Sequence, residues 1–234
     1  MDSEIGDHPD ALFSYEALTG QHLNSAFVNR TQVAKRLQQY GFEKVIISIR
    51  NQYDVLESAY RQYIKSGGVC AFENFVNFKS THPRFMHPHY FNYYLIYKLY
   101  SELFGKKNIL VLQYEDMKTE AFWRSLNSFL ETEIQMDTDE SSVNSSLSYN
   151  KTKLLRLLNN FAHSPYNRSA LITPKFSSKF IFNQLQKLPN FSKPKQFSTI
   201  ENKQEIGDFY AQSNRRLEKS ANIRLCDKYP KCYS

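Results

Sequence analysis

Two short apolar runs, each followed at once by polar residues and an amphipathic stretch, constrain the fold more than any other feature of the chain. The first is KVIISI at residues 44–49, and the second extends from Ile109 to Leu112. Neither run alternates between apolar and polar residues, as a strand with one face in water would. Continuous apolar strands are typical of parallel sheets, in which crossover helices cover both faces. The sequence therefore predicts an α/β fold with a parallel sheet flanked by helices.

Apolar residues at helical spacing predict the remaining elements. Glycine stop signals at Gly41, Gly67 and Gly105 close three of these patterns. The segment ALFSYEAL, residues 11–18, fits either a buried strand that ends near residues 14–16 or a helix. The predicted helices cover residues 30–40, 53–66, 72–78, 90–104, 122–129, 150–162, 177–188 and 203–220.

Composition indicates a globular chain, because 41% of the 234 residues are apolar and only seven are glycine. No apolar run approaches the ~20 residues of a membrane-spanning helix. The acidic N-terminus MDSEIGDHPD does not resemble a secretory signal. Cys70, Cys226 and Cys232 lack the spacing of a disulfide framework or a zinc site, which favours a reducing compartment. We therefore expect a soluble, cytoplasmic protein without a membrane span.

The positive charge is concentrated at the C-terminal end of the chain. Residues 1–174 hold 18 basic and 18 acidic residues, whereas residues 175–234 hold 12 basic and 5 acidic ones, which accounts for the net charge of +7. Such a block suits an anionic ligand, a nucleic acid or a membrane surface, and a solvated basic face gives the same composition. Within it, Lys203, Arg215 and Arg216 either close over a bound anion or lie on that solvated face.

The first strand ends on an arginine, Arg50, where a parallel sheet collects its ligands. A guanidinium offers a fixed fork of donors suited to phosphate, and Ser58, about one turn into the next helix, adds a hydroxyl. The first turn of that helix also exposes N–H groups, with Asn51 or Asp54 as the cap. Together these groups predict a phosphate-sized anion site. The alternative pairs Arg50 with a carboxylate such as Glu57 and leaves Ser58 as a surface hydroxyl.

The segment KVIISIRNQYDVLESAYRQYIKSGG resembles the 3′-phosphate-binding segment of bacterial-type sulfotransferases. LFGKKNILVLQYEDM is similar to the family's next strand with its Tyr-Glu-Asp motif, and FYAQSNRRLEKSANIRL resembles the closing helix. The resemblance implies a P-loop-NTPase-like fold in which Arg50 and Ser58 bind the 3′-phosphate of 3′-phosphoadenosine 5′-phosphosulfate (PAPS). It implies one domain over residues 1–234, with an α/β nucleotide-binding part at 11–135, a flexible connector at 136–149 and a mainly helical part at 150–234.

The family's glycine-rich loop for the 5′-phosphosulfate has no counterpart in the sequence, where Gly6 and Gly20 stand alone. We expect the chain to start near the family's second strand, either as part of a longer protein or after loss of this half-site. Backbone donors at such a loop stabilise the charge of the leaving group, which is worth several kcal/mol. The sequence therefore also fits a nucleotide-binding relic without turnover.

The resemblance implies that PAPS is the co-substrate, that no metal is needed, and that the acceptor is a hydroxyl or amine of a carbohydrate, lipid or small molecule. Glu16 is the candidate catalytic base, by comparison with carbohydrate sulfotransferases, and its alternative role is a salt-bridged or capping carboxylate. His82, His87 and His89 favour a loop at the acceptor entrance, with Arg84 nearby, over a metal site. A nucleic-acid binder that uses the basic C-terminal block is the less favoured reading, and no nucleic-acid partner is expected.

Two further patterns predict packing and bracing. Tyr90, Tyr93, Tyr94, Tyr97 and Tyr100 lie at helical spacing, which favours a core role over a platform for sugars. Glu115 and Asp116 are predicted to cap or brace the helix that follows their strand.

Overall fold

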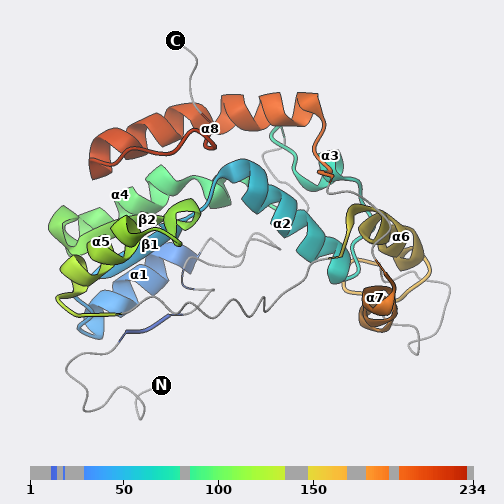
Figure 1. Cartoon of the computed structure of the whole chain (residues 1–234), viewed down its shortest axis with the longest axis horizontal. Helices are drawn as coiled ribbons and strands as arrows, with labels where there is room; N and C mark the ends of the chain where they lie inside the picture. The colour runs from blue at the N-terminus through green and yellow to red at the C-terminus, as the bar shows by residue number, and fades with distance from the viewer. Residues whose placement is uncertain are drawn as a thin grey trace.

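The computed structural model describes residues 12–14, 18, 29–79, 85–134, 147–167, 178–189 and 195–230 (Figure 1). Helices predominate, and each predicted helix has a counterpart within two or three residues of its expected bounds. The elements are α1 (Arg30–Gln39), β1 (Val45–Ile49), α2 (Gln52–Lys65), α3 (Phe72–Phe75), η3 (Pro88–Phe91), α4 (Tyr93–Phe104), η4 (Lys106–Asn108), β2 (Ile109–Gln113), η5 (Tyr114–Asp116), α5 (Glu120–Leu130), α6 (Tyr149–Asn159), α7 (Ser178–Lys187) and α8 (Ile200–Ala221).

The two apolar runs form a parallel pair of strands. Val45 of β1 is aligned with Ile109 of β2, and the register continues to Ile49 opposite Gln113. Parallel pairing requires a long crossover, and here the crossover runs through α2, α3 and α4. The α/β prediction is confirmed, and the register brings the carboxyl ends of both strands to one edge.

Helix α4 packs against both strands and also contacts α1 and α8. Helix α8 lies along the top of the view in Figure 1, and α2 runs from the sheet toward α6 and α7 at the opposite end of the molecule. The predicted tyrosine stripe is largely core, since Tyr90, Tyr93, Tyr97 and Tyr100 are all buried. The rings of Tyr60 and Tyr63 extend this core along α2, with Phe75 packed against both.

The covering of the strands is less complete than predicted. Ser48 of β1 is exposed, and both strands begin with two half-buried residues. Helix α5 packs against β2, yet it has no buried residue. The described residues form two strands of this sheet, and a sheet of that width is too narrow for helices on both faces to bury it fully.

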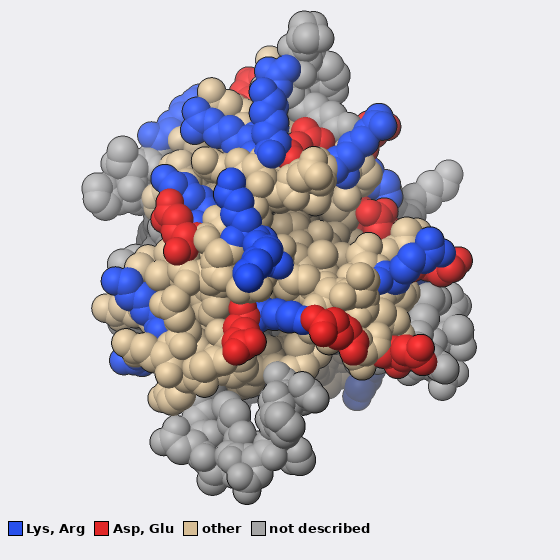
Figure 2. All heavy atoms as spheres, turned by 90° about the vertical axis from the view of Figure 1, so that its left-hand side faces the viewer, with Lys and Arg blue, Asp and Glu red and all other residues tan. Residues whose placement is uncertain are grey.

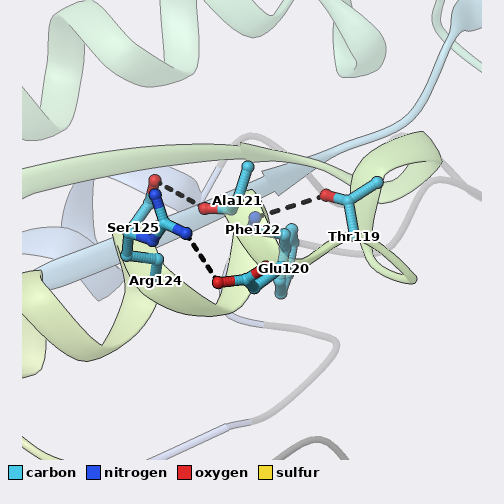
Figure 3. Close-up of polar contacts among 6 residues, drawn as sticks. All are labelled: Thr119, Glu120, Ala121, Phe122, Arg124 and Ser125. Carbon is cyan, nitrogen blue, oxygen red and sulfur yellow. Dashed lines mark hydrogen bonds and ion pairs between the residues drawn. The ribbon is translucent and has the colours of Figure 1, made fainter.

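Glycines end two helices as the sequence predicts, whereas the cap of α5 is not the predicted one. Thr119 accepts a hydrogen bond from the backbone N–H of Phe122 at 3.3 Å and so caps α5 (Figure 3). Gly105 ends α4 with φ of 82°, and Gly67 follows α2 with φ of 99°, conformations that favour glycine.

At the N-terminal end, residues 12–14 form no strand and Leu12 is exposed, so the buried-strand interpretation is wrong for these residues. Residues 15–17, which include Glu16, lie outside the described residues. Among the helices that are described, none combines the length and the apolar character needed to cross a membrane.

Candidate functional site

Arg50 follows β1 directly at the carboxyl edge of the sheet, and its backbone is held on both sides. The Tyr93 hydroxyl donates a hydrogen bond to the Arg50 carbonyl at 2.6 Å and accepts one from the Arg50 N–H at 3.4 Å. The half-buried guanidinium lies 5.0 Å from the ring centroid of Tyr114, the first residue after β2. Because Ile49 is aligned with Gln113, Arg50 and Tyr114 lie next to each other at the carboxyl edge of the sheet.

Glu115 braces the turn that carries Arg50. One carboxylate oxygen accepts hydrogen bonds from the backbone N–H and the side-chain amide of Asn51, both at 2.8 Å. The other oxygen accepts from the Tyr229 hydroxyl at 2.8 Å. Burial raises the pKa of Glu115, but the hydrogen bonds from Asn51 and Tyr229 outweigh it and lower the pKa overall. The predicted bracing of α5 by Glu115 is wrong, because Glu115 reaches back to the other strand and Thr119 caps α5.

Asn51 caps the N-terminus of α2. The sequence predicts either Asn51 or Asp54 in this role. The Asn51 side chain accepts a hydrogen bond from the Asp54 N–H at 3.0 Å. The Asn51 N–H is already bound by Glu115, so two backbone donors of this first turn are engaged within the protein. Fewer backbone N–H groups are therefore available to bind an anion here than predicted, so anion binding would depend more on the charge of Arg50.

Ser58 is exposed on α2, six residues after Gln52, which is roughly 9 Å along the helix axis. It therefore lies in the second turn of α2, a little further along the helix than the prediction of about one turn. No hydrogen bond joins Arg50 and Ser58 in the part of the chain that the structure describes, so a bound group would have to bridge them.

Glu57, next to Ser58, does not pair with Arg50. One of its carboxylate oxygens accepts hydrogen bonds from the backbone N–H groups of Phe197 and Ser198, both at 2.7 Å. Across the described ranges, the Arg50 guanidinium forms no ion pair with a carboxylate. The alternative interpretation, in which Glu57 neutralises Arg50, is therefore wrong.

Arg61 lies three residues after Ser58 and so on the same face of α2. Its guanidinium donates to the carbonyls of Leu147 at 2.9 Å and Lys195 at 3.2 Å, and lies 5.0 Å from the ring centroid of Phe197. Burial lowers the pKa of Arg61, and Glu57 opposes this shift. Glu57 and Arg61 thus fix the segment before α8 beside the exposed hydroxyl of Ser58.

The other predicted residues are distributed as follows. His87 accepts a hydrogen bond from the His89 N–H at 3.3 Å, while His82 and Arg84 lie outside the described residues. The described part of the chain contains no cluster of three or more His, Cys, Asp or Glu residues that could hold a metal ion. Lys203, Arg215 and Arg216 are exposed on α8.

A surface hollow of about 770 Å³ lies along α5, apart from the residues above. It is lined by Glu120, Glu131 and Glu133, and its one guanidinium, Arg124, pairs with Glu120 at 2.6 Å (Figure 3). Glu120 is paired with Arg124 and Glu131 with Lys44, so the residues that line the hollow include no unpaired cation. The remaining carboxylate, that of Glu133, disfavours a nucleotide. The hollow is therefore a poor candidate for the anion site.

Sequence reasoning did not identify Tyr93 and Tyr229 as parts of this site. The helical spacing of Tyr93 predicts a core residue, and Tyr93 is buried, but its hydroxyl also donates a hydrogen bond to the Arg50 carbonyl. Tyr229 lies 114 residues from Glu115, and no local pattern marks that pairing.

The strands, the arginine at their common edge and the capped helix that follows define an α/β protein with a candidate strand–turn–helix anion site. Residues 41–206 match the family model described as the sulfotransferase domain. The matched region covers more than two thirds of the chain. The chain belongs to the sulfotransferase family, and Arg50, Ser58 and Glu115 all lie within the matched region. No curated protein and no solved structure matched the chain in the same comparisons.

Proposed function

We propose that this sulfotransferase uses PAPS as its donor and that Arg50 and Ser58 bind the 3′-phosphate of the nucleotide. The acceptor is a hydroxyl or amine of a carbohydrate, a lipid or a small molecule. The observation that carries the proposal is the Arg50 guanidinium, which lies at the carboxyl edge of the sheet without a carboxylate partner among the described residues. Family membership supports sulfuryl transfer in general, and Arg50 supports the phosphorylated donor.

The surroundings of Arg50 suit a phosphate because they orient the guanidinium without neutralising it. Tyr93 holds its backbone and the ring of Tyr114 lies beside its side chain. Cation–π contact of this kind contributes about 0.5–1 kcal/mol at an exposed site and leaves the N–H fork available. An Arg–phosphate pair then forms two parallel charge-assisted hydrogen bonds.

In the proposed reaction, the acceptor oxygen or nitrogen attacks the sulfur in line and a new bond to sulfur forms. The bond from sulfur to the 5′-phosphate oxygen breaks, and 3′-phosphoadenosine 5′-phosphate leaves with that electron pair. A base removes the proton of the acceptor, and we assign this role to Glu16, which lies outside the described residues. Arg50 and Ser58 fix the donor at its far end, so their contribution is to position the reacting group.

Calorimetric titration with 3′-phosphoadenosine 5′-phosphate tests the binding site. Loss of a charged hydrogen bond costs about 1.5–3 kcal/mol, so Arg50→Ala should weaken binding roughly 10- to 150-fold. Ser58→Ala removes a single hydroxyl contact and should weaken it about 2- to 12-fold. Arg36→Ala, at an exposed arginine of α1, is the matched control and should bind like the original chain. Equal affinity of the Arg50→Ala and Arg36→Ala variants would refute the proposed site.

Turnover is a separate measurement, made by following the release of 3′-phosphoadenosine 5′-phosphate from PAPS with a panel of acceptors. Glu16→Gln should reduce transfer at least 100-fold while leaving nucleotide binding intact, because a general base contributes about 10²–10⁴ in rate. The relic hypothesis interprets the absence of a glycine-rich phosphate loop in this sequence as loss of the half-site for the 5′-phosphosulfate. It predicts nucleotide binding that depends on Arg50 with no transfer to any acceptor.

A further inference from the structure

Residues 141–200 contain nine Lys or Arg residues and no Asp or Glu. This stretch includes α6 and α7, which pack against each other and against α2. Lys153, Lys179, Lys187 and Lys195 are exposed in its described part. These basic residues give the α6–α7 end of the molecule a positive electrostatic field, and no carboxylate within the stretch offsets it.

The same two helices expose large apolar side chains. Leu154 and Leu157 are 44% and 57% exposed, and their spacing of three residues places them on one face of α6. Phe161, two residues after the end of α6, is 51% exposed. Phe180, near the start of α7, and Leu188, directly after its end, are exposed as well. Five of the eleven large apolar residues that are exposed in the described chain therefore belong to this end.

The inner sides of these helices already hold the fold, so the exposed face is not required for it. Asn159 donates hydrogen bonds to the carbonyls of Ile64 and Gly68, which ties α6 to the end of α2. Buried Lys151 donates to the carbonyl of Leu188 and joins α6 to the end of α7. The apolar stripe of α6 faces the other way, toward solvent.

The opposite end of the molecule has a different charge pattern. Figure 2 views the end formed by α1, α4, α5 and the last turns of α8, where acidic and basic side chains alternate over the surface. Ion pairs such as Lys44–Glu131 and Lys98–Glu102 lie in these elements or beside them. The combination of unopposed lysines with an apolar stripe is therefore a property of the α6–α7 end.

We propose that the α6–α7 face docks on the surface of an anionic phospholipid bilayer. Leu154, Leu157 and Phe161 enter the boundary between headgroups and acyl chains, and the lysines contact the lipid phosphates. A nucleic acid or an acidic polysaccharide would bind the lysines but leave the leucine and phenylalanine side chains in water. A second copy of the chain would cover the apolar stripe but bring two positive faces together.

Sedimentation with vesicles tests the proposal. The chain should bind phosphatidylcholine vesicles that contain phosphatidylserine, bind pure phosphatidylcholine weakly, and lose affinity as salt is raised. Lys153→Gln should reduce the partition coefficient roughly fivefold, the effect of one lysine near an anionic surface. Leu154→Ser combined with Leu157→Ser should reduce it at least tenfold, since two apolar side chains no longer enter the bilayer.

Leu95→Ser is the matched control, because Leu95 on α4 is 44% exposed, like Leu154, and should leave the partition coefficient unchanged. Circular dichroism verifies that each variant is folded. No binding to phosphatidylserine vesicles would overturn the proposal, and so would binding that the double leucine variant does not weaken, which would indicate a purely electrostatic polyanion site. A dimer in sedimentation velocity that the double leucine variant abolishes would equally overturn it in favour of self-association.

Discussion

The hydroxyl of Tyr93 is predicted to position Arg50, and Tyr93→Phe removes that hydroxyl alone. The Tyr93 side chain is buried, and the hydroxyl is the hydrogen-bond partner of both the carbonyl and the N–H of Arg50, at 2.6 and 3.4 Å. The substitution leaves the Arg50 carbonyl without this donor in a partly buried site. A buried polar group that loses its partner costs about 1–3 kcal/mol.

We therefore expect Tyr93→Phe to lower the free energy of unfolding by about 2 kcal/mol. Arg50 then samples orientations that do not face the nucleotide, and the affinity for 3′-phosphoadenosine 5′-phosphate should fall roughly 5- to 10-fold, equivalent to about 1–1.4 kcal/mol. Urea unfolding measures the first quantity and calorimetric titration the second.

Tyr97→Phe on the same helix separates positioning from stability. Tyr97 is 4% exposed against 5% for Tyr93, and its hydroxyl donates to the Ser220 carbonyl at 2.9 Å, away from Arg50. Both variants should lose similar stability, but only Tyr93→Phe should lose nucleotide affinity. If the two variants bind the nucleotide equally well, the reasoning that Tyr93 orients Arg50 is refuted.

Two other perturbations follow from the same contacts. The folded-state pKa of Glu115 lies below its ordinary value of 4.5, so its contribution to stability is present above that pH and is lost as pH falls through the folded pKa. Glu115→Gln should therefore lower the free energy of unfolding, measured in urea titrations, by about 1–2 kcal/mol at neutral pH and by progressively less in acid. The control Glu102→Gln, at an exposed residue of α4, should have nearly the stability of the original chain at every pH. Gly67→Ala should cost more than about 2 kcal/mol in thermal unfolding, because the new Cβ would lie 2.2 Å from the Cβ of Ser164 at a φ of 99°. Gly41→Ala, at a φ of 82° in open space, should cost only about 1 kcal/mol, and equal losses would contradict the steric argument.

The helices and strands could be predicted from the sequence because their signals are local. The apolar runs before Arg50 and Tyr114, the helical spacing of the tyrosines on α4, and the stops at Gly67 and Gly105 all act over a few residues. The position of Arg50 at the sheet edge follows from the same signals. The absence of an ion pair between Arg50 and Glu57 could not be predicted from these signals. It depends on the backbone N–H groups of Phe197 and Ser198, which bind the Glu57 carboxylate from about 140 positions away.

The bracing of the site could not be predicted for a related reason. Glu115 meets Asn51 only because the register aligns Ile49 with Gln113, and a shift of one residue would turn these side chains to other faces. Tyr229 reaches Glu115 only after α8 has packed on α4. No periodic pattern in the sequence indicates tertiary contacts of this kind.

The hydrogen bond from Tyr229 to Glu115 also affects the order in which the protein can mature during synthesis. Arg50 and its strand leave the ribosome long before Tyr229, which follows 179 positions later. At translation rates of about 5–20 residues per second, roughly 10–40 s pass before that hydroxyl is available. Glu115 is itself made 65 positions after Arg50, and for the last 114 positions of this interval one of its oxygens lacks its native donor. The nascent chain therefore cannot yet hold the turn after β1 as the finished protein does.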